Sequence, residues 1–256
     1  MSTFPLLITL LCLGQAEPDE VSLKAMLQRA QDCRVTLTND AKAKPQLVKT
    51  PVFRYSDEVR HIEDAGIWLW TERGRPVAAM KVEHYQPGAL PRPWLCCFAS
   101  MSERLVQAEW DADPTFRAKK PGVEWQALKD KPADTRAGRL LQMREIARRF
   151  SAELLRLAKG EQRDQMRLLP RPLYRYEENQ GNVLDGAIFG FTGTGTNPDV
   201  MLLLDLQPDA GWQFGFVGMT AEGVIVRLEG REIWQKKHTG YRDNVFDNWT
   251  WFLPAK

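Results

Sequence analysis

Two arginine–carboxylate pairs are the residues of this chain whose type and spacing could support acid–base chemistry. Arg54 precedes Asp64 by ten residues. Arg175 precedes Asp185 by the same interval. A carboxylate in a cleft can act as a general base, and an arginine beside it can stabilise a developing oxyanion. Because catalysis normally needs one site and this pair occurs twice, a structural role is favoured over a catalytic one.

The same spacing predicts how each pair is held. Ten residues are enough for a strand, a loop and the start of an antiparallel return strand, so the arginine and the aspartate can meet across one hairpin. We predict that they form a bidentate ion pair in each copy and fix the register of the first two strands. The tyrosine that follows each arginine is expected to shield the pair. The candidate binding residues are therefore Arg54, Tyr55, Asp64, Arg175, Tyr176 and Asp185.

Other motifs lack residues that their chemistry needs. Gly193 to Thr196 superficially resembles a phosphate-binding loop, but no Lys-Ser or Lys-Thr follows it, which favours a hairpin loop. A Gly-x-Ser-x-Gly signature of a serine nucleophile is absent. The three histidines (His61, His84 and His238) lie far apart, and there is no Cys-x-x-Cys, so we predict neither a metal site nor a cofactor.

The two pairs belong to a segment that occurs twice. The stretch from 51 to 70 aligns without gaps on 172 to 191, at an offset of 121 residues. A second block, WLCCFASMSERLV from Trp94, aligns on WQFGFVGMTAEGV from Trp212. Two matching blocks in the same order indicate an internal duplication.

Alternating apolar and polar residues predict strands within the matched blocks. Ala78, Met80 and Val82 share one strand face, whereas Lys81 and Glu83 take the other, as in a half-buried antiparallel sheet. Loops rich in glycine and proline separate the strands. Each copy is therefore expected to be a meander of about five strands.

A helix is expected ahead of each meander, at 21–30 in the first copy. In the second copy, apolar residues recur at steps of three and four and predict one amphipathic helix with a buried stripe. From 136 to 167 there are nine basic and four acidic residues, so this helix could bind an acidic surface, although a solvated face is favoured. We expect Arg144, Arg148 and Arg149 to stay in water. The stripe consists of Leu140, Met143, Ala147, Phe150, Leu154 and Leu157.

These patterns predict an α+β fold of two tandem homologous modules, each a leading helix followed by an antiparallel β-meander. Module 1 is expected to span residues 17–135, with a linker from 117 to 135 at its end, and module 2 residues 136–256. The sequence has four cysteines, and if residues 1–16, which contain Cys12, are removed as a signal peptide, an odd number remains: Cys33, Cys96 and Cys97. Because neighbouring strand residues point to opposite faces, buried thiols are favoured over a disulfide framework.

The first sixteen residues are predicted to be a signal peptide. An apolar run from Phe4 to Leu13 is too short to span a bilayer, and Gly14 and Ala16 suit cleavage after Ala16. No lysine or arginine precedes this run, and the alternative is a buried N-terminal strand or helix. We expect an exported protein, periplasmic or extracellular, with no stable membrane span after cleavage. The formal net charge of +2 argues against nucleic acid as a partner.

The unit Pro-apolar-aromatic-Arg-Tyr, found at Pro51 and Pro172, is followed in each copy by Asp with Ala or Gly and by a Trp-containing strand. This combination resembles a family of exported bacterial proteins that carry the unit twice. The resemblance implies export and a duplicated strand-rich architecture, but no activity or ligand. We predict a non-catalytic binding or scaffold protein of the periplasm or cell envelope, with an envelope protein or polymer as partner. The alternative is a hydrolase of an envelope or extracellular substrate that uses Asp64 or Asp185 with Arg54 or Arg175.

Overall fold

The structure is a computed structural model that describes residues 18–38, 42–111, 115–156, 162–177, 183–238 and 248–254. The expected signal peptide lies outside these residues. Antiparallel strands predominate, and the described residues contain two α-helices. No described helix has the length and apolar character needed to cross a membrane.

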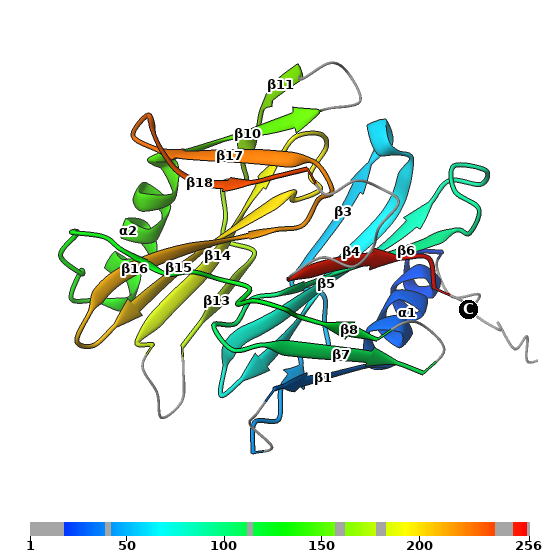
Figure 1. Ribbon diagram of the computed structural model, residues 1–256, viewed down its shortest axis with the longest axis horizontal. Helices are drawn as coiled ribbons and strands as arrows, with labels where there is room; N and C mark the ends of the chain where they lie inside the picture. Colours follow the sequence, from blue (N-terminus) through cyan, green and yellow to red (C-terminus); the bar gives the residue numbers. More distant parts are fainter. Residues whose placement is uncertain are drawn as a thin grey trace, which may run out of the picture.

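The described elements of the two halves of the chain follow one another in a similar order, apart from a 3-10 helix in the first half and one additional strand in the second (Figure 1). The first half contains α1 (Pro18–Gln31), β1 (Cys33–Leu37), β2 (Gln46–Leu47), β3 (Phe53–Asp57), the 3-10 helix η1 (Glu58–Arg60), β4 (Ile62–Glu72), β5 (Arg75–Tyr85), β6 (Trp94–Ser100), β7 (Val106–Trp110), β8 (Phe116–Arg117) and β9 (Gln126–Ala127). The second half contains α2 (Arg136–Arg148), β10 (Phe150–Arg156), β11 (Gln162–Gln165), β12 (Arg167–Leu168), β13 (Tyr174–Tyr176), β14 (Asp185–Thr192), β15 (Val200–Gln207), β16 (Gly211–Gly218), β17 (Gly223–Leu228), β18 (Arg231–Lys236) and β19 (Trp249–Phe252).

Two large sheets have the same strand order and the same register. One runs β19-β6-β5-β4-β2 and the other β9-β16-β15-β14-β12, with β3 and β13 pairing on β4 and β14. Tyr55 pairs with Ala65 on the first sheet, and Tyr176 pairs with Gly186 on the second. The offset of 121 residues found in the sequence therefore relates both members of each pair.

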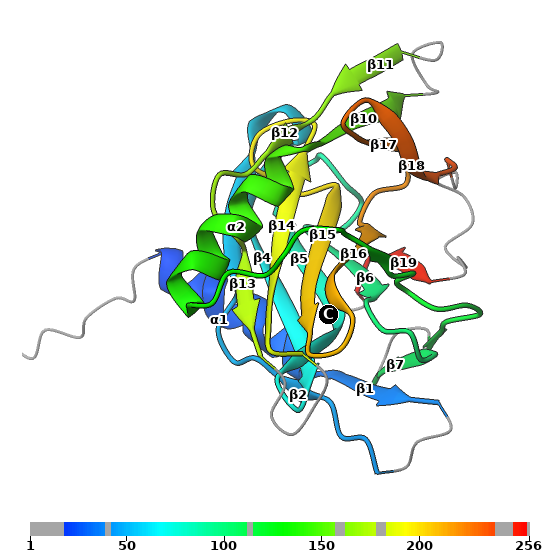
Figure 2. The same ribbon diagram turned by 90° about the vertical axis from the view of Figure 1, so that its left-hand side faces the viewer.

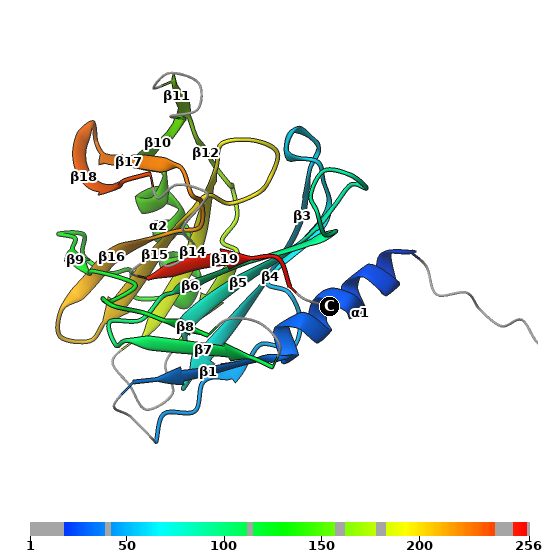
Figure 3. The same ribbon diagram turned by 45° about the vertical axis from the view of Figure 1, so that its right-hand side comes forward.

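The outer strand of each large sheet comes from the other half of the chain. β9 ends the first half but pairs with β16, and β19 ends the second half but pairs with β6. Figures 1 and 3 show β19, in red, running beside β6. Each half thus gives one strand to the other in a reciprocal exchange.

The two large sheets pack against each other over a shared apolar core. This central core takes residues from both sheets, such as Ile67 and Leu69 from β4 and Met201 and Leu203 from β15. The expectation that the polar face of the meander is solvated is therefore wrong for β5. Lys81 and Glu83 are only 1% and 3% exposed, because the second sheet covers their face.

A helix and a small sheet cover the outer face of each large sheet. α1 and the β1-β7-β8 sheet cover the first, and α2 and the β11-β10-β17-β18 sheet cover the second. Figure 1 shows α1 and α2 on opposite sides of the two large sheets. Met26 of α1 and Met143 of α2 are completely buried in these outer cores.

The helix expected in the second half is shorter than its apolar stripe suggested. α2 ends at Arg148, and Phe150 and Leu154 lie instead on β10, which pairs with β17. Spacings of three and four led to a helix, but Phe150, Ala152 and Leu154 also alternate and are buried on one strand face. Leu157 lies outside the described residues. In the first half, β1 takes the place that β10 has in the second. It pairs with β7, so β7 lies in a separate small sheet and not in the meander.

The basic residues of this region are not all free in water. Arg148 is exposed, whereas Arg149 contacts Asp130 at 2.8 Å and Glu229 at 2.9 Å. This pairing corrects the expectation for Arg149 and weakens the case for a basic binding helix. The cysteines match expectation: all three are buried free thiols, with Cys96 in an outer core and Cys97 in the central core.

Candidate functional site

The predicted ion pair of the first half is confirmed. Arg54 on β3 donates from Nε and Nη2 to the two oxygens of Asp64 on β4, at 2.8 and 2.7 Å. Burial alone raises the pKa of the Asp64 carboxyl, but the hydrogen bonds and charge of Arg54 outweigh this effect and lower the pKa below its ordinary value. The carboxylate therefore stays ionised and paired.

The equivalent pair of the second half is confirmed and has an additional partner. Arg175 donates from Nε and Nη2 to Asp185 at 2.8 and 2.6 Å, and Arg139 of α2 donates to the same carboxylate at 2.8 Å. Arg175 also donates to the Arg136 carbonyl at 2.6 Å, which joins the hairpin to the helix. Burial raises the pKa of Asp185, but the two arginines lower it overall.

These ion pairs have the geometry of structural connections. A general base works best when its pKa lies near the operating pH, whereas Asp64 and Asp185 have lowered pKa values. Each is held within its own hairpin, and Asp185 is additionally clamped to α2. This arrangement favours the non-catalytic hypothesis over the hydrolase alternative.

The two tyrosines do not shield these pairs. Adjacent strand residues point to opposite faces, so Tyr55 and Tyr176 enter the central core. Tyr55 donates its hydroxyl to Glu83 at 2.6 Å, and Tyr176 donates to Asp205. The expectation of shielding is therefore wrong, and each tyrosine instead binds a buried acid between the two sheets.

A loop of the opposite half reaches each of these buried acids. Asn197, in the loop between β14 and β15, donates to Glu83 at 3.3 Å and accepts from Lys81 at 2.6 Å. Arg75, the first residue of β5, contacts Asp205 at 2.7 Å. Each central hairpin thus inserts a polar side chain beside the tyrosine–acid pair of the other half.

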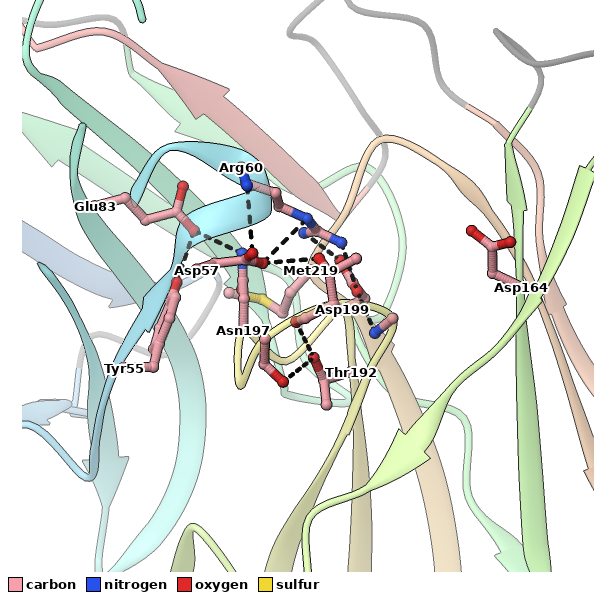
Figure 4. Close-up of polar contacts among 12 residues, drawn as sticks. Tyr55, Asp57, Arg60, Glu83, Asp164, Thr192, Asn197, Asp199 and Met219 are labelled. Carbon is pink, nitrogen blue, oxygen red and sulfur yellow. Dashed lines mark hydrogen bonds and ion pairs between the residues drawn. The ribbon is translucent and has the colours of Figure 1, made fainter. Parts of the chain in front are cut away.

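A third polar cluster closes one end of the contact between the halves (Figure 4). Arg60 of η1 makes a bidentate contact with Asp199 at 2.8 and 2.9 Å, and its Nε lies 3.4 Å from Asp57. Thr194 donates to Asp57 at 2.8 Å. The carboxylates of Asp57 and Asp199 are fully buried, and burial of a charge is tolerated when it is paired in this way. These clusters join the halves of the chain.

A groove of about 780 Å³ lies on another part of the surface. It lies between strands that the exchange brings together, β9, β16, β18 and the start of β19. Figure 2 shows β16, β18 and β19 on one side of the molecule. Its volume is in the range of small-ligand sites in proteins. The lining residues that matter below are Lys120, Glu124, Gln126, Phe216, Glu232, Trp234, Gln235, Lys236, Asn248 and Trp249.

Differences between equivalent positions explain why the groove opens in this half. Phe252 pairs with Cys96 on β6, and Gln126 holds the equivalent place opposite Phe214 on β16. Phe252 is buried with its ring 4.7 Å from that of Trp110, whereas Gln126 is exposed. The first half is filled at this place by Phe98, Trp110, Phe116 and Phe252.

Lys236 forms one wall of the groove. Its Nζ donates to the carbonyls of Glu222 and Lys237 at 3.2 and 3.3 Å and lies 5.5 Å from the ring of Trp249. A Cβ at Gly218 would lie 2.5 Å from Cδ of Lys236. The side chain of Lys236 can therefore pass over β16 at this position only because residue 218 is a glycine. Burial lowers the pKa of Lys236 to about 8.

Sequence reasoning missed the groove because its parts lie on three distant segments. The sequence does contain one sign of the groove, which is a difference in residue type between equivalent positions of the two copies. Cys96 and Phe214 are aligned, but the segments that pair with them carry Phe252 and Gln126 and fall outside the matched blocks.

No family model matches the sequence, and no curated protein or solved structure is significantly similar to it. Within the described residues, no group of three or more His, Cys, Asp or Glu side chains is placed to hold a metal ion.

Proposed function

We propose that the protein is a non-catalytic binding protein of the bacterial periplasm or cell envelope and that the groove between β9, β16 and β18 is its ligand site. The observation that carries the proposal is the groove itself, an aromatic-lined space with polar edges that equivalent residues fill in the other half. The carboxylates expected to act in the alternative hydrolase are held in ion pairs and have lowered pKa values.

The proposal includes the duplication. Two tandem modules, 17–135 and 136–256, descend from one unit, and the groove arose when one copy lost the rings that fill the other. The common strand order and the offset of 121 residues between paired residues support this history. Membership of the exported family that the repeated Arg-Tyr unit resembles is part of the same proposal.

Retention of envelope material on the immobilised protein tests the ligand site. Gln126→Phe restores the ring of the first half and should close the groove without disturbing the ion pairs. We expect the wild type to retain a protein or polymer from bacterial envelope extract and Gln126→Phe to lose it. Leu141→Ala, at an exposed position of α2, is the control and should behave as wild type. Equal retention by wild type and Gln126→Phe would refute the assignment of the groove.

Export is tested separately by expressing the full chain in a bacterium. The product should be recovered outside the cytoplasm with Glu17 as its first residue. A cytoplasmic product that still begins at Met1 would refute export and leave the groove assignment unaffected.

A further inference from the structure

The geometry points to a neutral saccharide chain as the ligand of the groove, an inference that rests on the proposed binding function. Three features carry it: the partly exposed ring of Trp234, the mixed donors and acceptors at the edges, and the near balance of charge. Each is a property of described residues of the groove.

Among the described lining residues, one tryptophan is partly exposed, whereas Phe216 and Trp249 are almost fully buried. Trp234 of β18 is partly exposed, and its ring centroid lies 5.5 Å from that of Phe216 on β16. Trp249, at the other end, is only 3% exposed and lies below the ammonium group of Lys236, so Trp234 provides the surface on which a sugar can stack. The C–H faces of sugar rings pack well on the flat face of tryptophan, while the indole edge stays compatible with water.

The edges of the groove combine acceptors with donors. Glu124 and Glu232 supply carboxylates, which only accept hydrogen bonds when ionised. Gln126, Gln235 and Asn248 supply amides, which donate and accept. A sugar hydroxyl both donates and accepts, so a row of hydroxyls needs both kinds of partner.

The charge of the groove does not suit a charged polymer. The described lining residues include three lysines (Lys120, Lys236 and Lys237) and two glutamates (Glu124 and Glu232), which is a small positive excess. A polyanion would meet the two carboxylates, and a polycation would meet the three ammonium groups; like charges brought together oppose binding. A neutral chain meets neither penalty.

An extended peptide is the competing occupant, because β18 is the last strand of its sheet among the described residues. A peptide that extends a sheet needs the backbone groups along the open edge. Side chains already occupy carbonyls in this region: Gln126 donates to the Ile233 carbonyl at 3.3 Å, and Lys236 donates to that of Lys237. These contacts favour a ligand that binds side chains over one that pairs with the strand.

Calorimetric titration of the full protein with neutral hexasaccharides tests the inference. The probes are cellohexaose, maltohexaose and N-acetylchitohexaose, and a neutral peptide of serine, threonine and valine is the comparison. At least one saccharide should bind with a dissociation constant on the order of 0.1 mM. Trp234→Ala should weaken that binding about tenfold, because it removes the stacking surface. Trp94→Ala, a tryptophan of the first half outside the groove, is the matched control and should bind as wild type.

Glu232→Gln gives a second variant that does not alter the packed rings. It keeps the shape of an exposed side chain and should weaken the saccharide several-fold even if Trp234→Ala fails to fold. Binding of the peptide but of no saccharide, with the same dependence on Trp234, would overturn the ligand class while the proposed binding function stands. Failure of Gln126→Phe to change retention of envelope material would instead overturn the proposed function.

Discussion

Replacing Asp185 by alanine should destabilise the protein much more than replacing Asp64, although both residues form the same ion pair. The Asp185 side chain is 3% exposed, and its partners Arg175 and Arg139 are 18% and 19% exposed. The Asp64 side chain is 17% exposed, and that of Arg54 is 34% exposed. Water can therefore compensate for the loss of Asp64 better than for the loss of Asp185.

The structure allows the two magnitudes to be separated. Without Asp185, two guanidinium groups face each other with no carboxylate between them, which should cost about 3 kcal/mol. Without Asp64, one guanidinium on a side chain that is 34% exposed loses its partner, which should cost about 1 kcal/mol. For a protein of this size, these losses correspond to decreases in Tm of roughly 9 °C and roughly 3 °C.

Urea and thermal unfolding, followed by circular dichroism, measure both values. Adding Arg175→Ala to Asp185→Ala should recover part of the lost stability, because it removes one of the two uncompensated charges. Equal destabilisation by the two single aspartate variants would refute the argument from burial. Two fully stable variants that fail to retain envelope material would show that the ion pairs belong to a functional site.

Three further predictions concern the contact between the halves and the exchanged strand. Burial raises the pKa of Asp205 to about 6, so its contribution to stability is present below the unfolded pKa of 3.8 and is lost as the pH rises through 6. Urea unfolding should show that, between pH 4 and 6, the free energy of unfolding of the wild type falls by at most about 3 kcal/mol relative to that of Asp205→Asn. Parallel pH profiles of the two proteins would contradict this. Gly195→Ala should lower the free energy of unfolding by about 2 kcal/mol, because φ is +52° and the new Cβ would lie 3.0 Å from Asp57. Gly211→Ala, at φ +72° with open space around it, should lower it by about 1 kcal/mol. Equal unfolding energies for the two variants would exclude a packing effect at Gly195. Ending the chain at residue 247 removes β19, which pairs with β6 opposite Cys97. The Cys97 thiol of this shortened chain should react with Ellman's reagent within minutes. A thiol that stays as protected as in the wild type would show that β19 is not needed to bury Cys97.

Local patterns in the sequence were sufficient to predict the ion pairs, α1 and the hairpins. Arg54 and Asp64 are ten residues apart, and the strands that carry them are neighbours in the chain and in the sheet. The same reasoning failed where two local patterns coincide. Phe150 and Leu154 fit both a helical stripe and one face of a strand, and pairing of β10 with β17 decides for the strand.

Long-range packing explains the remaining errors. Lys81 and Glu83 alternate with apolar residues as solvated strand residues do, but their partners come from the opposite half. Lys81 donates to Asn197, which is 116 residues away, and to the carbonyl of Met219, which is 138 residues away. Only the face-to-face packing of two sheets makes these side chains buried, and no local window of sequence contains that information.

In the function that we propose, the reciprocal exchange also links ligand binding to assembly of the two halves. One wall of the groove is β9, which the first half contributes to the sheet of the second. The opposite wall is β18, and Trp249 at one end belongs to the strand that the second half contributes to the first. A ligand in the groove contacts both exchanged segments, which are together only in the folded chain. Because it binds the folded state and not the unfolded one, its binding energy adds to the energy that holds the halves together.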